Sequence, residues 1–128
     1  MEYLDLDGEI EVGSVLVPED TYEVSSKRVD FVDVGDTPNL VIHWVVLEGK
    51  WQSTEIPDFY AMTTKALFRL RNLLRALDLV PKGERVSFKV GDLPVKLEGL
   101  TATIDVTIEE YEGVERNKVR VVNGQRLA

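Results

Sequence analysis

Apolar and polar residues alternate along much of the chain, a pattern typical of half-buried β-strands. Over residues 21–33 the period of two is interrupted, which predicts a β-bulge or a strong bend. Residues 35–38 (GDTP) predict a turn. Residues 40–47 then form the strongest predicted strand, and a hairpin returns the chain over residues 51–56 until Pro57 stops it. Three consecutive strands therefore form a meander.

The period changes to that of a helix over residues 63–77, which contain neither Gly nor Pro. Thr63 or Thr64 can cap the N-terminus, and Pro81 and Gly83 end the helical region. One broad apolar face contains Ala66, Leu67, Leu70, Leu73, Leu74 and Leu77. Residues 84–99 are mixed, with short extended pieces such as Val86–Val90 and a turn at Gly91-Asp92.

The last third of the chain alternates again. Residues 100–109 predict a strand with one buried face, and residues 116–122 pair back with it as a hairpin. The order of three strands, one helix and two strands lacks the alternation of a parallel α/β fold. It predicts a mainly β fold with one α-helix, a five-stranded OB-fold barrel whose helix lies between the third and fourth main strands. We expect an acidic N-terminal arm at residues 1–16, the OB-fold domain at 17–122 and a short C-terminal tail at 123–128.

Composition narrows the possible functions. The chain has 128 residues, the size of one domain, and contains no cysteine and one histidine, His43. Disulfides, thiolate zinc sites and thiol nucleophiles are therefore excluded. No apolar run approaches the ~20 residues of a membrane span, so we expect a soluble cytoplasmic protein without a membrane partner.

The net charge of −8 is concentrated at the N-terminus. Residues 1–20 contain seven acids and no base, whereas the other 108 residues contain 16 acids and 15 bases. An acidic total argues against DNA binding by bulk positive charge, but it leaves room for a local basic track. If the body has such a track, we expect the acidic arm to compete with DNA for it within the same molecule. The alternatives are a solubilising terminus, or an extra strand held by Tyr3, Leu4 and Leu6.

Motifs for catalysis are absent. The sequence has no Walker loop, no dinucleotide fingerprint and no nucleophile elbow. A metal-dependent nuclease site built on Asp36 and Glu48-Gly49-Lys50 is a weak alternative, because the triplet lies in a predicted hairpin turn. We therefore expect a protein that is not an enzyme and needs no cofactor or metal.

The basic residues indicate binding instead. The window 61–76 contains no acid, and its cations lie opposite the leucine face on a helical wheel, around Phe68. Four cations around an aromatic ring suit a phosphate backbone with a base stacked beside it. The alternative is an ordinary solvated helix face. The four cations are Lys65, Arg69, Arg71 and Arg75.

The other aromatics divide by strand phase. Trp44 shares its phase with apolar neighbours and is predicted to be a core residue. Val41, His43 and Val45 then face outward, as a stacking surface, a dimer contact or a seat for the arm. Trp51, beside Lys50 at a hairpin tip, is a stacking candidate, with packing over the barrel mouth as its alternative. Further candidates for nucleic-acid contacts are Lys27, Arg28 and Tyr60, which follows the core-like Phe59.

A resemblance to known proteins rests on the segments Val17–Val24 (VPEDTYEV), Thr37–Leu40 (TPNL) leading into Trp44, Val46 and Gly49-Lys50, Arg69–Leu77 (RLRNLLRAL), Leu97–Leu100 (LEGL), Glu112-Gly113 and Asn117–Val119 (NKV). These segments resemble a family of small bacteriophage single-stranded DNA-binding proteins with an OB-fold, formerly a domain of unknown function. If the protein is viral, its expected place is the host cytoplasm. The resemblance covers residues 15–122, and its motifs are structural. It implies binding of single-stranded DNA in phage replication or recombination, without catalysis and with replication or recombination proteins as further partners.

Two features depart from that family. Such proteins often end in an acidic tail, whereas this chain has no acid after Glu115. The predicted loops at 33–36 and 109–112 are acidic, so we expect the binding track to lie elsewhere. The sequence thus predicts a largely sequence-independent single-stranded DNA-binding protein. The alternative is a protein–protein or virion-assembly module, such as a homodimer, that uses the outward row at 41–45.

Overall fold

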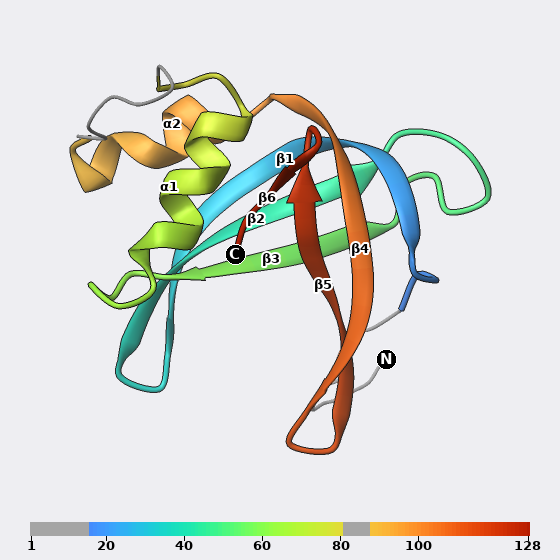
Figure 1. Ribbon diagram of the computed structural model, residues 1–128, viewed down its shortest axis with the longest axis horizontal. Coiled ribbons are helices and arrows are strands. Elements are labelled where there is room, and N and C mark those ends of the chain that lie inside the picture. Colours follow the sequence, from blue (N-terminus) through green and yellow to red (C-terminus); the bar gives the residue numbers. More distant parts are fainter. Residues whose placement is uncertain (1–15, 81–87) are drawn as a thin grey trace, which may run out of the picture.

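The computed structural model describes residues 16–80 and 88–128, and within them the fold is mainly β. Six antiparallel strands form one open sheet in the order β3-β2-β1-β4-β5-β6 (Figure 1). The helices are α1 (Leu67–Ala76) and the five-residue α2 (Leu93–Leu97), which follows a 3₁₀ turn at Val90–Asp92. The strands are β1 (Asp20–Val34), β2 (Thr37–Val46), β3 (Glu55–Ala61), β4 (Thr101–Tyr111), β5 (Val114–Val122) and β6 (Gln125–Arg126).

The long strand β1 organises the sheet. It pairs with β2 over most of its length, and its first residues also pair with β4. The expected bulge is confirmed, because the register with β2 shifts between Ser26 and Arg28 and leaves Lys27 without a partner in the ladder. Extra twist at a bulge lets one strand serve two differently inclined parts of a curved sheet.

The third strand differs from its prediction. Pro57 does not stop β3, which runs from Glu55 to Ala61 and pairs along β2, with Pro57 opposite His43. Proline is tolerated there because β3 is an edge strand of the sheet, where one side of the backbone has no ladder partner. The prediction failed because only the sheet order reveals that this strand lies at an edge.

The core lies inside the curve of the sheet, with α1 packed over one end (Figure 1). Trp44 is fully buried, as predicted from its phase. Leu70, Leu73 and Leu74 carry the buried face of α1, whereas Leu67 remains 41% exposed. The apolar face of the helix is therefore narrower than the sequence indicated.

Helix boundaries and the C-terminal end also differ from expectation. The helix starts at Leu67, and Thr63 caps the preceding turn by accepting from the Ala66 amide. α2 is a second helix where only extended pieces and a turn were expected, and the first two residues of the Val86–Val90 piece lie outside the described residues. The end of the chain is not a loose tail, because β6 pairs with β5 and Leu127 is buried.

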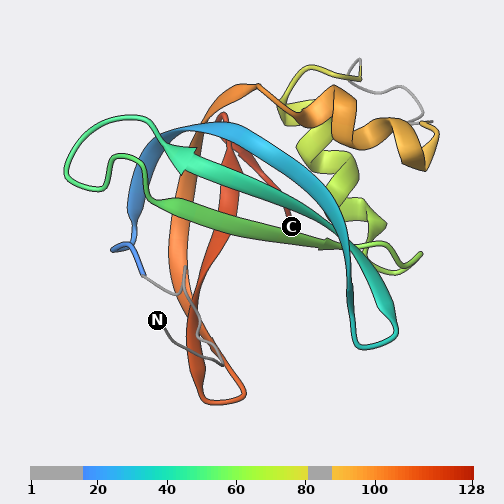
Figure 2. The same ribbon diagram turned by 180° about the vertical axis from the view of Figure 1, so that it is seen from behind.

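Two hairpins project from the sheet in the same direction, as both faces of the molecule show (Figures 1 and 2). The β1–β2 hairpin turns at Gly35 and the β4–β5 hairpin at Gly113, and both glycines have positive φ angles. Among the described residues no backbone ladder joins β3 to β5, so the sheet stays open where a closed five-stranded barrel was expected. Nor is any helix in that part of the chain long and apolar enough to cross a membrane.

Candidate nucleic-acid interface

Arg69 is a structural residue rather than a surface cation. Its guanidinium lies 3.1 Å from Asp58 of β3 and donates to the main-chain carbonyl oxygens of Phe59 and Val119 at 2.9 and 2.7 Å. Both members of the ion pair are buried. Burial lowers the pKa of Arg69, but the charges of Asp58, Tyr60 and Glu109 and the hydrogen bond to Asp58 together outweigh this and raise the pKa above its usual value. The expected DNA contact by Arg69 is therefore corrected.

Tyr60 is also inside the protein, so its expected stacking on DNA is corrected too. Its hydroxyl donates to Asp58 at 2.6 Å, and the ring lies 4.3 Å from the Arg69 guanidinium. Trp44 donates its Nε1–H to the same carboxylate at 3.1 Å. Burial, and next the Asp58 charge, raise the pKa of Tyr60 well above its usual value of 10. Phe59, interpreted from the sequence as core-like, is instead 42% exposed.

His43 lies on the outer face of the sheet, inside a small polar cluster. Its Nε2 is 3.3 Å from Asp30 and its Nδ1 is 3.3 Å from Glu55, so each ring nitrogen faces a different carboxylate. Arg28 contacts both Asp30, at 2.8 Å, and the His43 ring, at 3.2 Å. Val41, expected to extend an exposed apolar row, is only 2% exposed. The outward row is therefore not the open apolar face on which the protein–protein alternative depended.

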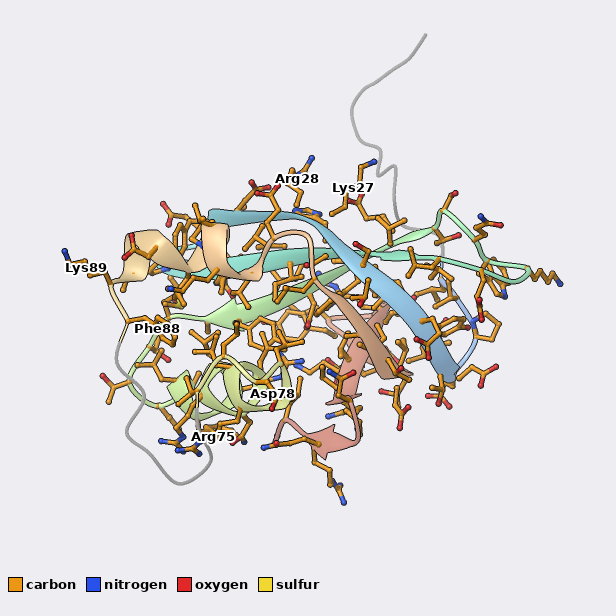
Figure 3. All side chains as sticks on the ribbon, turned by 90° about the horizontal axis from the view of Figure 1, so that it is seen from above. Lys27, Arg28, Arg75, Asp78, Phe88 and Lys89 are labelled. Carbon is orange, nitrogen blue, oxygen red and sulfur yellow. The ribbon has the colours of Figure 1, made fainter. Side chains whose placement is uncertain are left out.

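The predicted cations do not form one patch. Figure 3 shows Lys27 and Arg28 pointing away from one side of the molecule and Arg75 pointing away from the opposite side. Phe68 and Arg71 are exposed on α1 and Lys65 is exposed in the turn before it, while Arg75 is half-buried. The helix and the first strand therefore cannot contact the same short stretch of a ligand.

Trp51 lies at a third place, beyond the end of β2 that is remote from the two hairpins. It is half-buried against the core, and the Lys50 ammonium lies 5.6 Å from its ring. The surface pocket that Trp51 lines contains one cation, Lys50, against the three acids Asp20, Glu23 and Glu48. Three carboxylates repel a phosphate backbone, so this position favours the packing alternative for Trp51.

The structure brings a different set of residues together between the two hairpins. A groove of about 440 Å³ runs from Val34 at the tip of the first hairpin, along β3, to β4 and β5 of the second. Phe59 and Tyr111 present exposed rings in it, and the Arg116 guanidinium lies 5.4 Å from the Tyr111 ring. Lys118 completes the basic side of the groove.

The electrostatics of this groove are mixed. Partial burial, and next the positive charge of Arg69, lower the pKa of Lys118 from its usual value. Glu109 also lines the groove, but it pairs with Arg120 at 3.2 Å. Two aromatic rings and two cations thus line the same groove, a composition that suits a polyanion carrying flat bases.

Sequence reasoning missed these four groove residues. The loop residues at 33–36 and 109–112 are acidic, which argued against phosphate contacts at both hairpins, and Phe59, beyond the predicted end of its strand at Pro57, was interpreted as core-like. The available signal was the alternation of Arg116 and Lys118 on one face of a predicted strand.

Comparisons with known proteins leave the site to be interpreted from its geometry. No protein-family model matches the chain, and a search of curated proteins found no match. Within residues 16–80 and 88–128 no group of three or more His, Asp or Glu side chains is placed to hold a metal ion.

Proposed function

We propose that this protein is a non-catalytic, largely sequence-independent single-stranded DNA-binding protein with an OB-fold, acting in phage DNA replication or recombination. The observation that carries the proposal is the groove between the β1–β2 and β4–β5 hairpins, with Phe59 and Tyr111 exposed beside Arg116 and Lys118. OB-folds bind oligonucleotides on the face of strands 2 and 3, between these same two loops.

The connectivity supports the OB-fold part of the proposal. A three-strand meander is followed by α1 and then by the β4–β5 hairpin, and β1 pairs with both β2 and β4. The OB-fold barrel is itself only partly closed. Where a ladder between β3 and β5 is lacking, Arg69 joins the two strands through Asp58 and the Val119 carbonyl.

The chemistry of the groove supports the ligand class. Stacking of a base on an aromatic ring contributes roughly 1–3 kcal/mol and tolerates any sequence, because every base has a π-face. Arg116 and Lys118 supply charge for the phosphates between the stacked bases. Duplex DNA hides its base faces, so exposed rings beside cations favour a single strand.

The test is a titration of fluorescein-labelled oligo(dT) followed by anisotropy at low and at high salt. We expect binding that weakens as salt rises, because cations on phosphates release counterions. Phe59→Ala should weaken binding about 10-fold or more, in line with the loss of one stacked base. Phe68→Ala is the matched control, since both phenylalanines are 42% exposed and only Phe59 lies in the groove.

The alternatives predict different results in the same titration. If α1 is the DNA-binding face, Phe68→Ala weakens binding and Phe59→Ala does not. Absence of oligo(dT) binding even at low salt overturns the proposed function altogether. Tighter binding to double-stranded DNA of the same length than to oligo(dT) would contradict the proposed preference for single strands.

A further inference from the structure

A second groove lies at the other end of the molecule, between α1 and the segment that leads into α2. It has a volume of about 270 Å³ and a mostly apolar lining, to which Arg71 adds one cation. Figure 3 shows Phe88 between the two helices, with Lys89 extending outward beside it. The lining residues are Met62, Leu67, Leu70, Arg71, Leu74, Phe88, Val90 and Leu93.

The lining leaves apolar surface open to solvent. Leu67 is 41% exposed and Val90 is 55% exposed, although both are large apolar side chains beside a concave surface. Apolar surface gathered in one place and rimmed by polar residues marks an interaction site. The groove is separate from the hairpin groove proposed to bind DNA, since the two share no lining residue.

The charged residues around this groove are mainly basic. Lys89 stands between two lining residues, Lys65 precedes Leu67 by two positions, and Arg71 belongs to the lining itself. Asp92 is an acid next to Leu93. A ligand that offers apolar side chains together with negative charge matches this composition.

The same chain contains a segment of that composition. Residues 1–15 lie outside the described part of the structure and contain five acids and no base. Large apolar residues are interspersed among these acids. They are Tyr3, Leu4, Leu6, Ile10 and Val12.

The position at which the described part of the chain begins favours binding of residues 1–15 to the groove of a second copy rather than to the groove of their own molecule. The main chain of Val17 is held by Asn117 of β5 through two hydrogen bonds of 2.9 Å. This start lies at the opposite end of the molecule from α1 and α2 in two perpendicular views (Figures 1 and 3). Fifteen extended residues span about 50 Å, enough to reach a neighbouring molecule, whereas to reach the groove of their own molecule they would have to run along the whole length of its body.

We propose that the groove between α1 and α2 binds residues 1–15 of a second copy of this chain. The arm of one molecule and the groove of the next are different surfaces, so the contact is head-to-tail and can repeat along a row of molecules. The inference does not depend on DNA binding, because neither the arm nor this groove belongs to the hairpin groove.

The first experiment is sedimentation velocity of the full chain at increasing concentration, without DNA. We expect self-association that weakens with salt. An arm variant, Leu4→Glu with Leu6→Glu, and a groove variant, Leu67→Lys, should each be monomeric. Mixed together, they should form a one-to-one dimer, because each keeps the half that the other has lost. Val95→Lys is the matched control, an 81% exposed position on α2 outside the groove lining, and should associate like the wild type.

The second experiment uses a fluorescein-labelled peptide of residues 1–15 and the full-length arm variant. We expect the peptide to bind this variant, and to bind at least 10-fold more weakly when Leu67→Lys is added but not when Val95→Lys is added. Equal peptide affinity with and without Leu67→Lys overturns the proposal. A wild-type chain that stays monomeric at every concentration while the peptide binds would place the arm in its own groove and overturn the second-copy assignment.

Discussion

Arg69 of α1 and Asp58 of β3 form a buried ion pair at 3.1 Å, and the same guanidinium donates to the Val119 carbonyl of β5 at 2.7 Å. One side chain thus links a helix to two strands that share no backbone ladder. The Asp58 carboxylate also accepts hydrogen bonds from Trp44 and Tyr60, so four side chains from three elements converge at this point. The hairpin groove lies directly above it, since Asp58 also lines that groove.

Removing the cation from this pair should destabilise the fold strongly. Arg69→Met leaves Asp58 as a buried charge without its partner, a change that typically costs about 3–5 kcal/mol. Urea unfolding followed by circular dichroism measures the loss. The double variant Arg69→Met with Asp58→Asn should recover most of it, because no unpaired charge remains; a double variant as unstable as the single one would contradict this explanation.

Stability should also fall at alkaline pH because of Tyr60. Its pKa is raised in the folded protein by burial and by Asp58, so the folded state keeps its proton above pH 10 while the unfolded state loses it. The unfolded state then binds fewer protons, and the free energy of unfolding decreases as pH rises above about 10. Urea midpoints measured between pH 8 and pH 11.5 test this. Tyr60→Phe, less stable at pH 8, should show a shallower decline; an equal decline would assign the effect to other groups.

Trp51→Ala should reduce stability without changing affinity for oligo(dT). The ring packs against the core but is only half-buried, so we expect a loss of about 1–3 kcal/mol, less than the roughly 3–5 kcal/mol of a fully buried aromatic such as Trp44. Thermal unfolding and anisotropy titration separate the two quantities. Weaker binding at unchanged stability would restore Trp51 as a stacking residue.

The sequence predicted what depends on local pattern. Alternation located β1, β2 and β4 and placed Trp44 in the core, and the interrupted period in β1 marked the bulge at Lys27. These features follow from side chains that alternate between two faces of one strand. They can be predicted without knowing which strands become neighbours.

The features that the sequence could not predict depend on which elements become neighbours in the folded protein. A helical wheel placed Arg69 opposite the leucines, yet its partner Asp58 lies eleven positions away on another element. Pro57 is acceptable only because β3 is an edge strand. The groove joins Phe59 to Lys118 across a gap between strands that no backbone ladder spans, so neither residue signals the other in the sequence.

The salt dependence of DNA binding can show which of two basic regions contacts the phosphates, the hairpin groove or the region around α1. Each phosphate contact on a single strand contributes about 0.7 to the slope of log K against log salt concentration. Lys118→Gln should therefore reduce the slope by about 0.7, because Lys118 lines the hairpin groove. Lys65→Gln removes the same charge from the exposed start of the α1 region and should leave the slope unchanged. Oligo(dT) titrations at four or more salt concentrations give both slopes, and the opposite pattern would place the phosphates on α1, where the sequence first suggested them.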